Sequence, residues 1–242
     1  MKTLRLFPLV LCLALVAPAA PAQEKINALF ISGGGYHDYE KTTPYLAEQI
    51  GKQIPIQWTV KYGLDAFQDE SFGEGFDVIV YDCCFPGENN PKGVENALRA
   101  TREGTPTVIV HCATVCFLSL PEWQKLVGHT IKGHDKYRAM QTVKADPEHP
   151  IMKRFPDNWQ TEGDELYRIS VPGENSHALL KAKSPEDDKE HAVAWTHQYG
   201  QGRVFATSLG HDLKTIEDKD YHALLANGIL WTLERLDQEP SP

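Results

Sequence analysis

The chain has 242 residues, with 24 Lys and Arg against 33 Asp and Glu and a formal net charge of −9. An acidic chain without a cluster of cations argues against a nucleic-acid partner, because phosphate binding needs grouped Lys and Arg. The length is enough for one well-buried α/β domain.

The first 22 residues have the pattern of a secretory signal peptide. A basic start and an apolar run over 6–16 precede the small-x-small site Ala20-Pro21-Ala22. The run is too short to span a membrane. We therefore expect cleavage after Ala22 and a secreted or periplasmic protein without membrane attachment. The domain is expected over 23–237 and a flexible tail over 238–242. The sequence does not indicate an oligomeric state.

The first half of the mature chain predicts strands that alternate with helices. The expected strands are 26–31, 56–60, 78–81 and 107–111; the expected helices are 42–50, with Thr42 or Thr43 as N-cap, and 91–103, ended by Gly104. Alternation of this kind predicts a parallel sheet with right-handed crossovers and helices on both faces. The predicted fold class is therefore α/β, doubly wound and flavodoxin-like.

The second half is less regular. Between about 121 and 154 the apolar periodicity weakens, which predicts irregular structure and short strands over the carboxyl-terminal edge of the sheet. Late strands follow at 167–171, 178–183, 192–196 and 203–207, some of them antiparallel, and a helix over 221–236 closes the chain.

Histidines follow several of the predicted strands. His37 comes after the first strand, His111 lies at the end of the strand at 107–111, and His211 comes after the strand at 203–207. Since the carboxyl ends of parallel strands lie at one edge of a sheet, we expect these three side chains to converge. His111 is expected at the most exposed position of that crevice. The alternative is that such residues only cap or fill local structure.

Short motifs recur along the chain in a fixed order, and together they resemble the ThuA-like (trehalose utilisation) family from about Ile26 to Trp231. The motifs are Gly33-Gly34-Gly35-Tyr36-His37, Val110-His111-Cys112, Val127-Gly128-His129 with His134, Asp164-Glu165-Leu166-Tyr167, Ala194-Trp195-Thr196, Tyr199-Gly200-Gln201-Gly202-Arg203, Gly210-His211-Asp212 and Asn227-Gly228-Ile229-Leu230-Trp231. The resemblance implies a three-layer sandwich of the class I glutamine amidotransferase-like superfamily. It also implies a small-molecule carbohydrate as substrate, with a keto-sugar or disaccharide derivative as the first candidate.

The resemblance and the residue types together give a set of candidate site residues. The catalytic candidates are His37, His111, His134, Glu165 and His211; the candidates for substrate binding are Gly34, Gly35, Tyr36, Asp164, Tyr167 and Asp212. Adjacent residues of an extended segment point to opposite faces, so Asp164 and Glu165 cannot both face one pocket. Glu165 is the preferred site carboxylate. The three glycines are expected to form a tight turn or an anion-binding loop.

Glutamine hydrolysis is not expected. Class I amidotransferases carry their nucleophile in a Gly-x-Cys-x-Gly elbow, whereas Val110-His111-Cys112-Ala113-Thr114 lacks both glycines. The His-x-Glu partner is also missing, because Asp212 and Leu213 follow His211.

Histidines and a carboxylate suit two kinds of chemistry. They can transfer protons on a carbonyl sugar near neutral pH, which is the leading hypothesis. They can also bind Zn, Ni or Fe, although no compact ligand motif is present. We predict no cofactor but keep a divalent metal as an alternative. The rival functions are a non-catalytic sugar-binding or scaffold domain and a hydrolase that uses Cys112.

Four cysteines remain after the predicted cleavage, namely Cys83, Cys84, Cys112 and Cys116. No Cys-x-x-Cys pair is present, which argues against a structural zinc site. Any disulfide is expected to join Cys83 or Cys84 to Cys112 or Cys116, because the two strand ends should be neighbours. Free thiols are the alternative.

Overall fold

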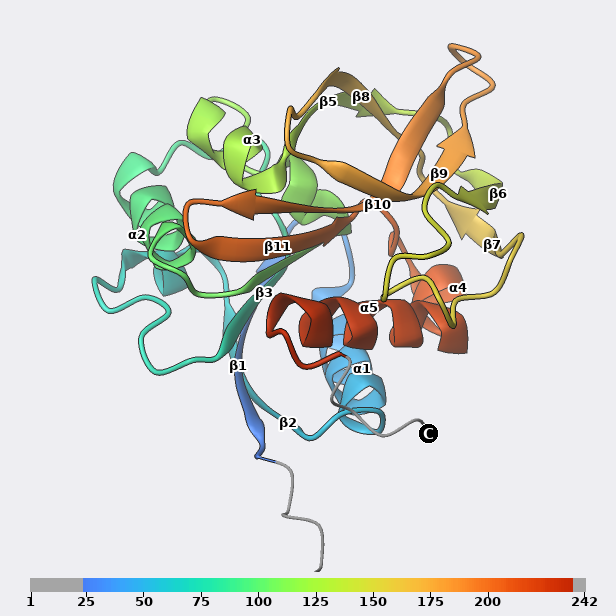
Figure 1. The fold of residues 1–242 in the computed structure, drawn as a ribbon. Coiled ribbons are helices and arrows are strands. Elements are labelled where there is room, and N and C mark those ends of the chain that lie inside the picture. Colours follow the sequence, from blue (N-terminus) through green and yellow to red (C-terminus); the bar gives the residue numbers. More distant parts are fainter. Residues whose placement is uncertain (1–23, 237–242) are drawn as a thin grey trace, which may run out of the picture.

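The computed structural model describes residues 24–236 (Figure 1). The predicted signal peptide and tail lie outside the described residues. The first half contains β1 (Ile26–Gly34), α1 (Tyr39–Gly51), β2 (Ile56–Tyr62), the 3-10 helix η1 (Leu64–Gln68), β3 (Val78–Cys84), α2 (Pro91–Arg102), β4 (Thr107–Val110), the 3-10 helix η2 (His111–Val115) and α3 (Pro121–Val127). The second half contains β5 (His129–His134), β6 (Arg138–Lys144), β7 (Gln160–Asp164), β8 (Tyr167–Pro172), β9 (His177–Lys183), β10 (Glu190–Tyr199), β11 (Gly202–Thr207), α4 (Leu213–Ile216) and α5 (Lys219–Thr232). No helix within residues 24–236 is long and apolar enough to cross a membrane.

Nine strands form one mixed sheet in the order β2-β1-β3-β4-β11-β10-β9-β6-β7. The neighbours from β2 to β11 are parallel. From β11 onward the pairs are antiparallel, as predicted for the late strands. The remaining strands, β5 and β8, pair with each other in a separate small sheet. The α/β class is therefore confirmed, and its sheet is mixed.

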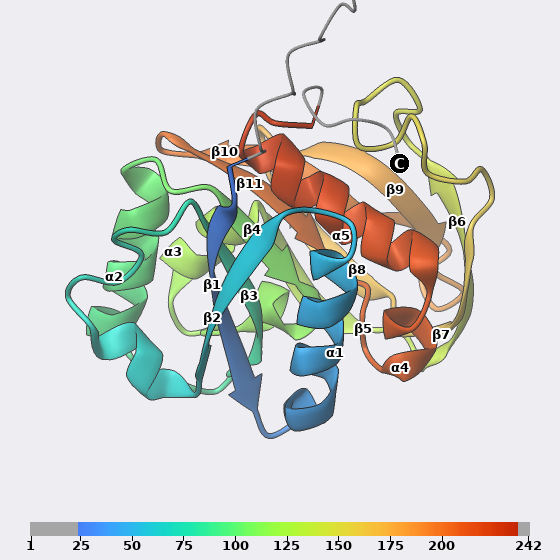
Figure 2. The same ribbon diagram turned by 90° about the horizontal axis from the view of Figure 1, so that it is seen from below.

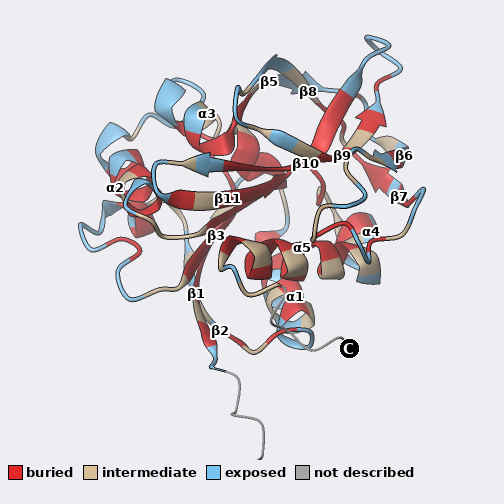
Figure 3. Cartoon of the chain, viewed as in Figure 1, coloured by how far each residue is buried: buried red, intermediate tan, exposed pale blue. Residues whose placement is uncertain are grey.

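Helices cover both faces of the parallel part of the sheet. Side chains of a strand alternate between faces, so Phe30 of β1 packs with α1 and α5, whereas Leu29 packs with α2 and α3. Figure 2 shows α1 and α5 side by side on one face, with α2 and α3 on the other. Figure 3 shows that the strands between them are buried, and that exposed residues lie on the outer sides of helices and on loops.

Several element boundaries differ from the sequence-based predictions. The predicted N-caps Thr42 and Thr43 are wrong, because α1 begins at Tyr39 and Asp38 occupies the cap position. Thr43 is instead fully buried inside the helix, where its hydroxyl lies 2.6 Å from that of Ser32. Several short elements were not predicted, namely α3, α4, β7 and the two 3-10 helices. Helix α3 has only seven residues and ends at Gly128, whose φ of 90° lies in the left-handed region.

The crossing of α5 and β11 gives a test of core packing. A Cβ atom on Gly228 of α5 would overlap the buried ring of Phe205. We expect Gly228→Ala to lower the free energy of unfolding by about 1–3 kcal/mol, because overpacking outweighs the gain in helix propensity. Gly51→Ala is the matched control, since the space around Gly51 is open. It should leave the free energy unchanged or raise it by up to about 1 kcal/mol. Equal effects in urea unfolding would contradict the close packing.

Candidate functional site

Residues from several strand ends line one pocket of about 270 Å³ at the carboxyl edge of the parallel strands. Its polar lining consists of six predicted site residues, namely Tyr36, His37, His134, Glu165, Tyr167 and His211. Its apolar wall, which the sequence did not predict, is formed by Pro86, Val115, Leu118 and Ile131. The pocket lining therefore contains both polar and apolar side chains.

His111 lies beneath the floor of this pocket. It is 1% exposed, so the prediction that it occupies the most exposed crevice position is wrong. The reason is its backbone: with φ at 47°, His111 begins η2 instead of extending β4, and the ring turns inward. Its ring still lies next to those of His37 and His211, with centroids 4.8 Å and 5.3 Å away.

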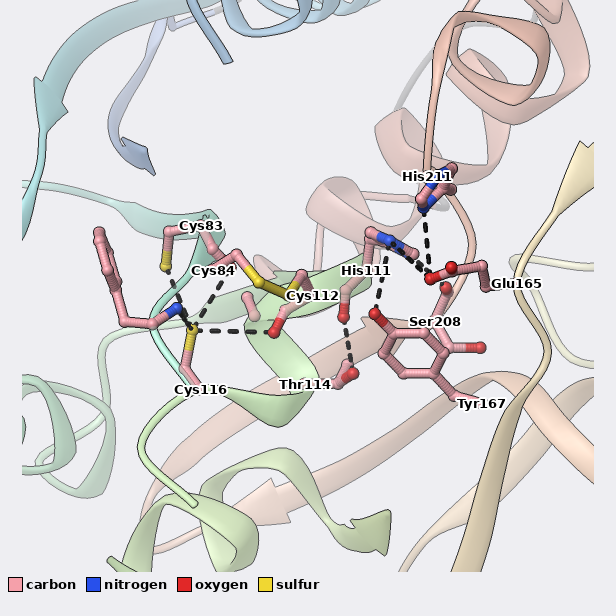
Figure 4. Close-up of a disulfide and its surroundings, with 12 residues drawn as sticks. Cys83, Cys84, His111, Cys112, Thr114, Cys116, Glu165, Tyr167, Ser208 and His211 are labelled. Atoms are coloured by element: carbon pink, nitrogen blue, oxygen red, sulfur yellow. Dashed lines mark hydrogen bonds and ion pairs between the residues drawn. A yellow bond between two sulfur atoms is a disulfide. The ribbon is translucent and has the colours of Figure 1, made fainter. Parts of the chain in front are cut away.

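A backbone carbonyl fixes the orientation of the His111 ring. Nδ1 of His111 lies 2.8 Å from the carbonyl oxygen of Ser208 (Figure 4). A carbonyl only accepts hydrogen bonds, so Nδ1 carries the proton and Nε2 presents a lone pair. Burial lowers the pKa of His111 to about 4, which leaves the ring neutral at pH 7. Nε2 faces the Tyr167 hydroxyl at 3.5 Å and Glu165 Oε2 at 4.0 Å.

Strand register explains why His111 and Ser208 meet. Val110 of β4 pairs with Thr207 of β11, and the next residue of each strand is His111 or Ser208. The sequence analysis missed Ser208. The sequence did contain a signal for this residue, because Ser208 directly follows the predicted strand at 203–207. That strand is the parallel neighbour of the one that precedes His111.

His37 and His211 complete a group of three imidazoles. Their ring centroids are 4.9 Å apart and the rings meet edge to face. Burial, with the adjacent His111 and His211, lowers the pKa of His37 to about 4. Contact with Glu165 raises the pKa of His211, although partial burial opposes the shift.

The Glu165 carboxylate lies among these histidines. Its Oε2 is 3.3 Å from His211 Nδ1, and its Oε1 is 3.4 Å from His134 Nδ1. Burial alone would raise the pKa of Glu165, but contact with His211 and the charges of His134 and His111 hold it below its usual value. The side chain is only 15% exposed. Glu165 is thus an ionised carboxylate at the side of the pocket.

Asp164 faces away from the pocket, as the alternation of an extended segment requires. It is fully buried and accepts backbone N–H bonds from Gly210 and Glu165, both at 2.8 Å. The backbone N–H of His211 is 3.4 Å from the same carboxylate. The prediction that Asp164 contacts substrate is therefore corrected: its carboxylate holds the loop that carries His211.

Three other predicted substrate contacts lie outside the pocket lining. Asp212 caps α4 by accepting the Lys214 N–H at 2.9 Å, and its other oxygen accepts the Tyr137 hydroxyl at 2.7 Å. Gly34 has a φ of 122° and lies against the backbone of Cys84. Gly34 therefore fits the tight-turn alternative, whereas the space around Gly35 is open.

A disulfide joins Cys84 at the end of β3 to Cys112 in η2, which is one of the predicted pairings (Figure 4). Both cysteines line the pocket. Cys83 and Cys116 are free and buried, with their sulfur atoms 3.9 Å apart. Because Cys112 is bonded to Cys84, it offers no thiolate, and the hydrolase that uses Cys112 loses its nucleophile.

The family model for ThuA, described as trehalose utilisation, matches residues 27–232. The chain belongs to the ThuA family. The matched range includes every pocket-lining residue, so the candidate site lies within the ThuA domain. No curated protein matches the sequence.

Solved structures share this ThuA fold at low sequence identity. A ThuA-like protein from Bacteroides uniformis ATCC 8492 aligns with a TM-score of 0.73 and 16% identity, over 89% of this chain and 95% of that one. A ThuA-like protein from Parabacteroides merdae ATCC 43184 gives 0.70 and 21%, over 87% and 90%. A cytoplasmic protein from Salmonella typhimurium LT2 gives 0.64 and 13%, over 86% and 99%.

Two neighbouring aspartates test how the His211 loop is held. Each carboxylate oxygen of Asp164 accepts a hydrogen bond from a backbone N–H. In Asp164→Asn, one of these oxygens becomes an NH2 group, which cannot accept that bond. A buried group that loses its partner costs about 1–3 kcal/mol, so we expect the free energy of unfolding to fall by that amount. Asp212→Asn is the control, because Asn is also a good N-cap, and its effect should stay within about 0.5 kcal/mol. A larger loss for Asp212→Asn would contradict this assignment.

A second buried carboxyl group gives a test by pH. Asp82 of β3 is 4% exposed, its Oδ2 has no hydrogen-bond partner among the described residues, and burial raises its pKa to about 7. The folded state therefore binds this proton more tightly than the unfolded state, whose pKa is near 3.8. The resulting stabilisation is complete below about pH 4 and is lost as the pH rises through 7.

As the pH rises from 4 to 8, the free energy of unfolding of Asp82→Asn should accordingly increase relative to that of the wild type. The gain is at most about 4 kcal/mol, at roughly 1.4 kcal/mol for each pKa unit. Urea unfolding of both proteins at several pH values measures it. If the difference in the free energy of unfolding does not change with pH, burial does not raise the pKa of Asp82.

Proposed function

We propose that this ThuA-family protein binds a small carbohydrate in the pocket and transforms it by proton transfer, with Glu165 as the group that takes the proton. The observation that carries the proposal is the Glu165 carboxylate, which is mostly buried and lies within 4.0 Å of nitrogens of His111, His134 and His211. A general base must be ionised and held within reach of the proton that it removes. This carboxylate is ionised, and its contacts with His134 and His211 hold it at the side of the pocket.

The pocket supports a small and amphipathic ligand. Its volume of about 270 Å³ is just below the range of about 300–1,000 Å³ for ligand pockets, which suits one small molecule better than a polymer. The ring of Tyr167 and the wall that includes Leu118 and Ile131 offer apolar contact to the C–H faces of a sugar. The imidazoles and Glu165 offer hydrogen bonds to its oxygens.

The substrate class rests on the family. ThuA is described as trehalose utilisation, and we propose a disaccharide or a keto-sugar derivative for this chain. A carbonyl group acidifies the neighbouring C–H, which gives a carboxylate base a proton to remove. We also propose that the protein is exported after cleavage of residues 1–22. We further propose that the parallel half of the sheet is flavodoxin-like.

The substitution Glu165→Gln tests the assigned role. Gln keeps the size of the side chain but cannot take a proton. We expect turnover of a keto-trehalose substrate to fall by about 10²–10⁴-fold, while binding of trehalose and keto-trehalose changes less than about tenfold. Isothermal titration measures binding, and mass spectrometry of the products measures turnover.

His111→Asn and His149→Asn form a matched pair for the same assay. Asn tolerates the positive φ of His111 and can keep the bond to the Ser208 carbonyl, but it lacks Nε2, so turnover or sugar binding should fall. His149 lies outside the pocket lining, and an Asn oxygen can accept the Ile151 N–H that its Nδ1 now accepts at 3.3 Å. His149→Asn should therefore behave as wild type.

Sugar binding without turnover in the wild-type protein would favour the non-catalytic sugar-binding domain and overturn the proposal.

A further inference from the structure

Three imidazole nitrogens converge at the base of the pocket. One ring nitrogen from each of His37, His111 and His211 lies within 4.8 Å of the other two. The three residues follow β1, β4 and β11, so the sheet brings them together from distant parts of the chain. We propose that these three histidines bind one divalent transition-metal ion, with Glu165 beside the position that the protein ligands leave open.

The His111 ring is held in the way that metal-binding histidines usually are. Such a histidine donates its second N–H to a carbonyl or carboxylate, and this bond fixes the tautomer and aims the other nitrogen at the metal. Nδ1 of His111 donates to the Ser208 carbonyl at 2.8 Å, and Nε2 therefore presents its lone pair to the group. Buried His197 and His222 also pair a ring nitrogen with a backbone carbonyl, so the bond alone does not mark a metal ligand. His111 differs because its second nitrogen belongs to a cluster of three imidazoles.

His211 brings a second nitrogen to the carboxylate side of the group. Its buried Nδ1 lies 3.3 Å from Glu165 Oε2, in an ion-pair contact. An ion bound by the three imidazoles would therefore have this carboxylate close to it. The carboxylate would also offset part of the charge of the ion.

The distances are compatible with a metal after a small adjustment. A zinc ion bound by nitrogens at about 2.0–2.1 Å places those nitrogens about 3.3 Å apart in a tetrahedron. Atoms now within 4.8 Å would need to approach by about 1.5 Å at most. His37 and His211 are partly exposed and lie in loops after their strands, so their side chains can make this movement while His111 stays fixed.

The donor set selects the class of ion. Neutral imidazoles favour Zn²⁺, Co²⁺ and Ni²⁺, whereas Mg²⁺ and Ca²⁺ prefer oxygen ligands. A second donor set, His37 with Cys84 and Cys112, satisfies the same distance limit. Those two sulfur atoms form the disulfide and cannot act as thiolates, so the set of three histidines is the one available here.

A bound ion would act as a Lewis acid on a sugar oxygen close to Glu165. This role rests on the proposed function, but the binding of the ion does not. The two proposals therefore fail separately. A protein that binds zinc but no sugar would overturn only the proposed function. A protein that turns over a sugar but binds no Zn²⁺ or Co²⁺ would overturn only the metal site.

The experiment is a metal titration of the purified, chelator-treated chain with Zn²⁺, Co²⁺ and Mg²⁺. We expect saturable binding of one Zn²⁺ or Co²⁺ per chain and no binding of Mg²⁺ at the same concentrations. His37→Gln and His211→Gln should each weaken binding by about 100-fold or more, since losing even an outer partner of a ligand costs about 10–100-fold. His149→Asn should bind as wild type. Circular dichroism of the metal-free variants separates lost ligands from lost folding.

The Co²⁺ spectrum distinguishes the two donor sets. Nitrogen and oxygen ligands give only weak visible bands, whereas thiolates add strong charge-transfer absorption in the near ultraviolet. We expect no charge-transfer band, and we expect the Cys84→Ser/Cys112→Ser double variant to retain the metal. Failure of the wild type to bind Zn²⁺ and Co²⁺, undiminished binding by folded His37→Gln and His211→Gln, or a thiolate spectrum would each overturn the proposal.

Discussion

The hydrogen bond between His111 Nδ1 and the Ser208 carbonyl is the interaction on which the arrangement of the site depends. It joins the ends of two adjacent parallel strands, β4 and β11, at the level where their pairing stops. By using up one nitrogen, it decides which atom of His111 faces the pocket. Because the ring is buried and neutral, that atom offers a lone pair and not a proton. The metal site that we propose follows from this choice, and in the proposed sugar chemistry the same atom faces the Glu165 carboxylate.

Two further connections hold the other components around His111. The disulfide between Cys84 and Cys112 ties the end of β3 to η2, one residue beyond His111. The buried carboxylate of Asp164 accepts backbone N–H groups from the loop that carries His211, and the next residue, Glu165, turns into the pocket. Buried groups beneath the pocket thus position the polar side chains that line it. Such a site is pre-organised, which lowers the cost of orienting a ligand.

The convergence of His37, His111 and His211 could be predicted from sequence, because parallel strands place their carboxyl ends at one edge. Alternation along an extended segment likewise predicted that only one of Asp164 and Glu165 faces the pocket, while the preference for Glu165 came with the family resemblance. The burial of His111 could not be predicted, because it depends on one left-handed backbone angle that turns the chain into a 3-10 helix. The roles of Asp164 and Asp212 depend on backbone N–H groups that become partners only in the folded chain. Short elements such as α3 have too few residues to show a periodicity.

The most direct measurement is the long-range ¹H–¹⁵N NMR spectrum of the histidine rings in the metal-free protein, which reports the tautomer and charge of each imidazole. We predict that His111, assigned by the loss of its signals in His111→Asn, is the neutral tautomer with its proton on Nδ1 at pH 7. Because burial lowers its pKa to about 4, it should remain neutral at pH 5.5. A His111 ring that carries its proton on Nε2, or that is positively charged at pH 7, would contradict the account.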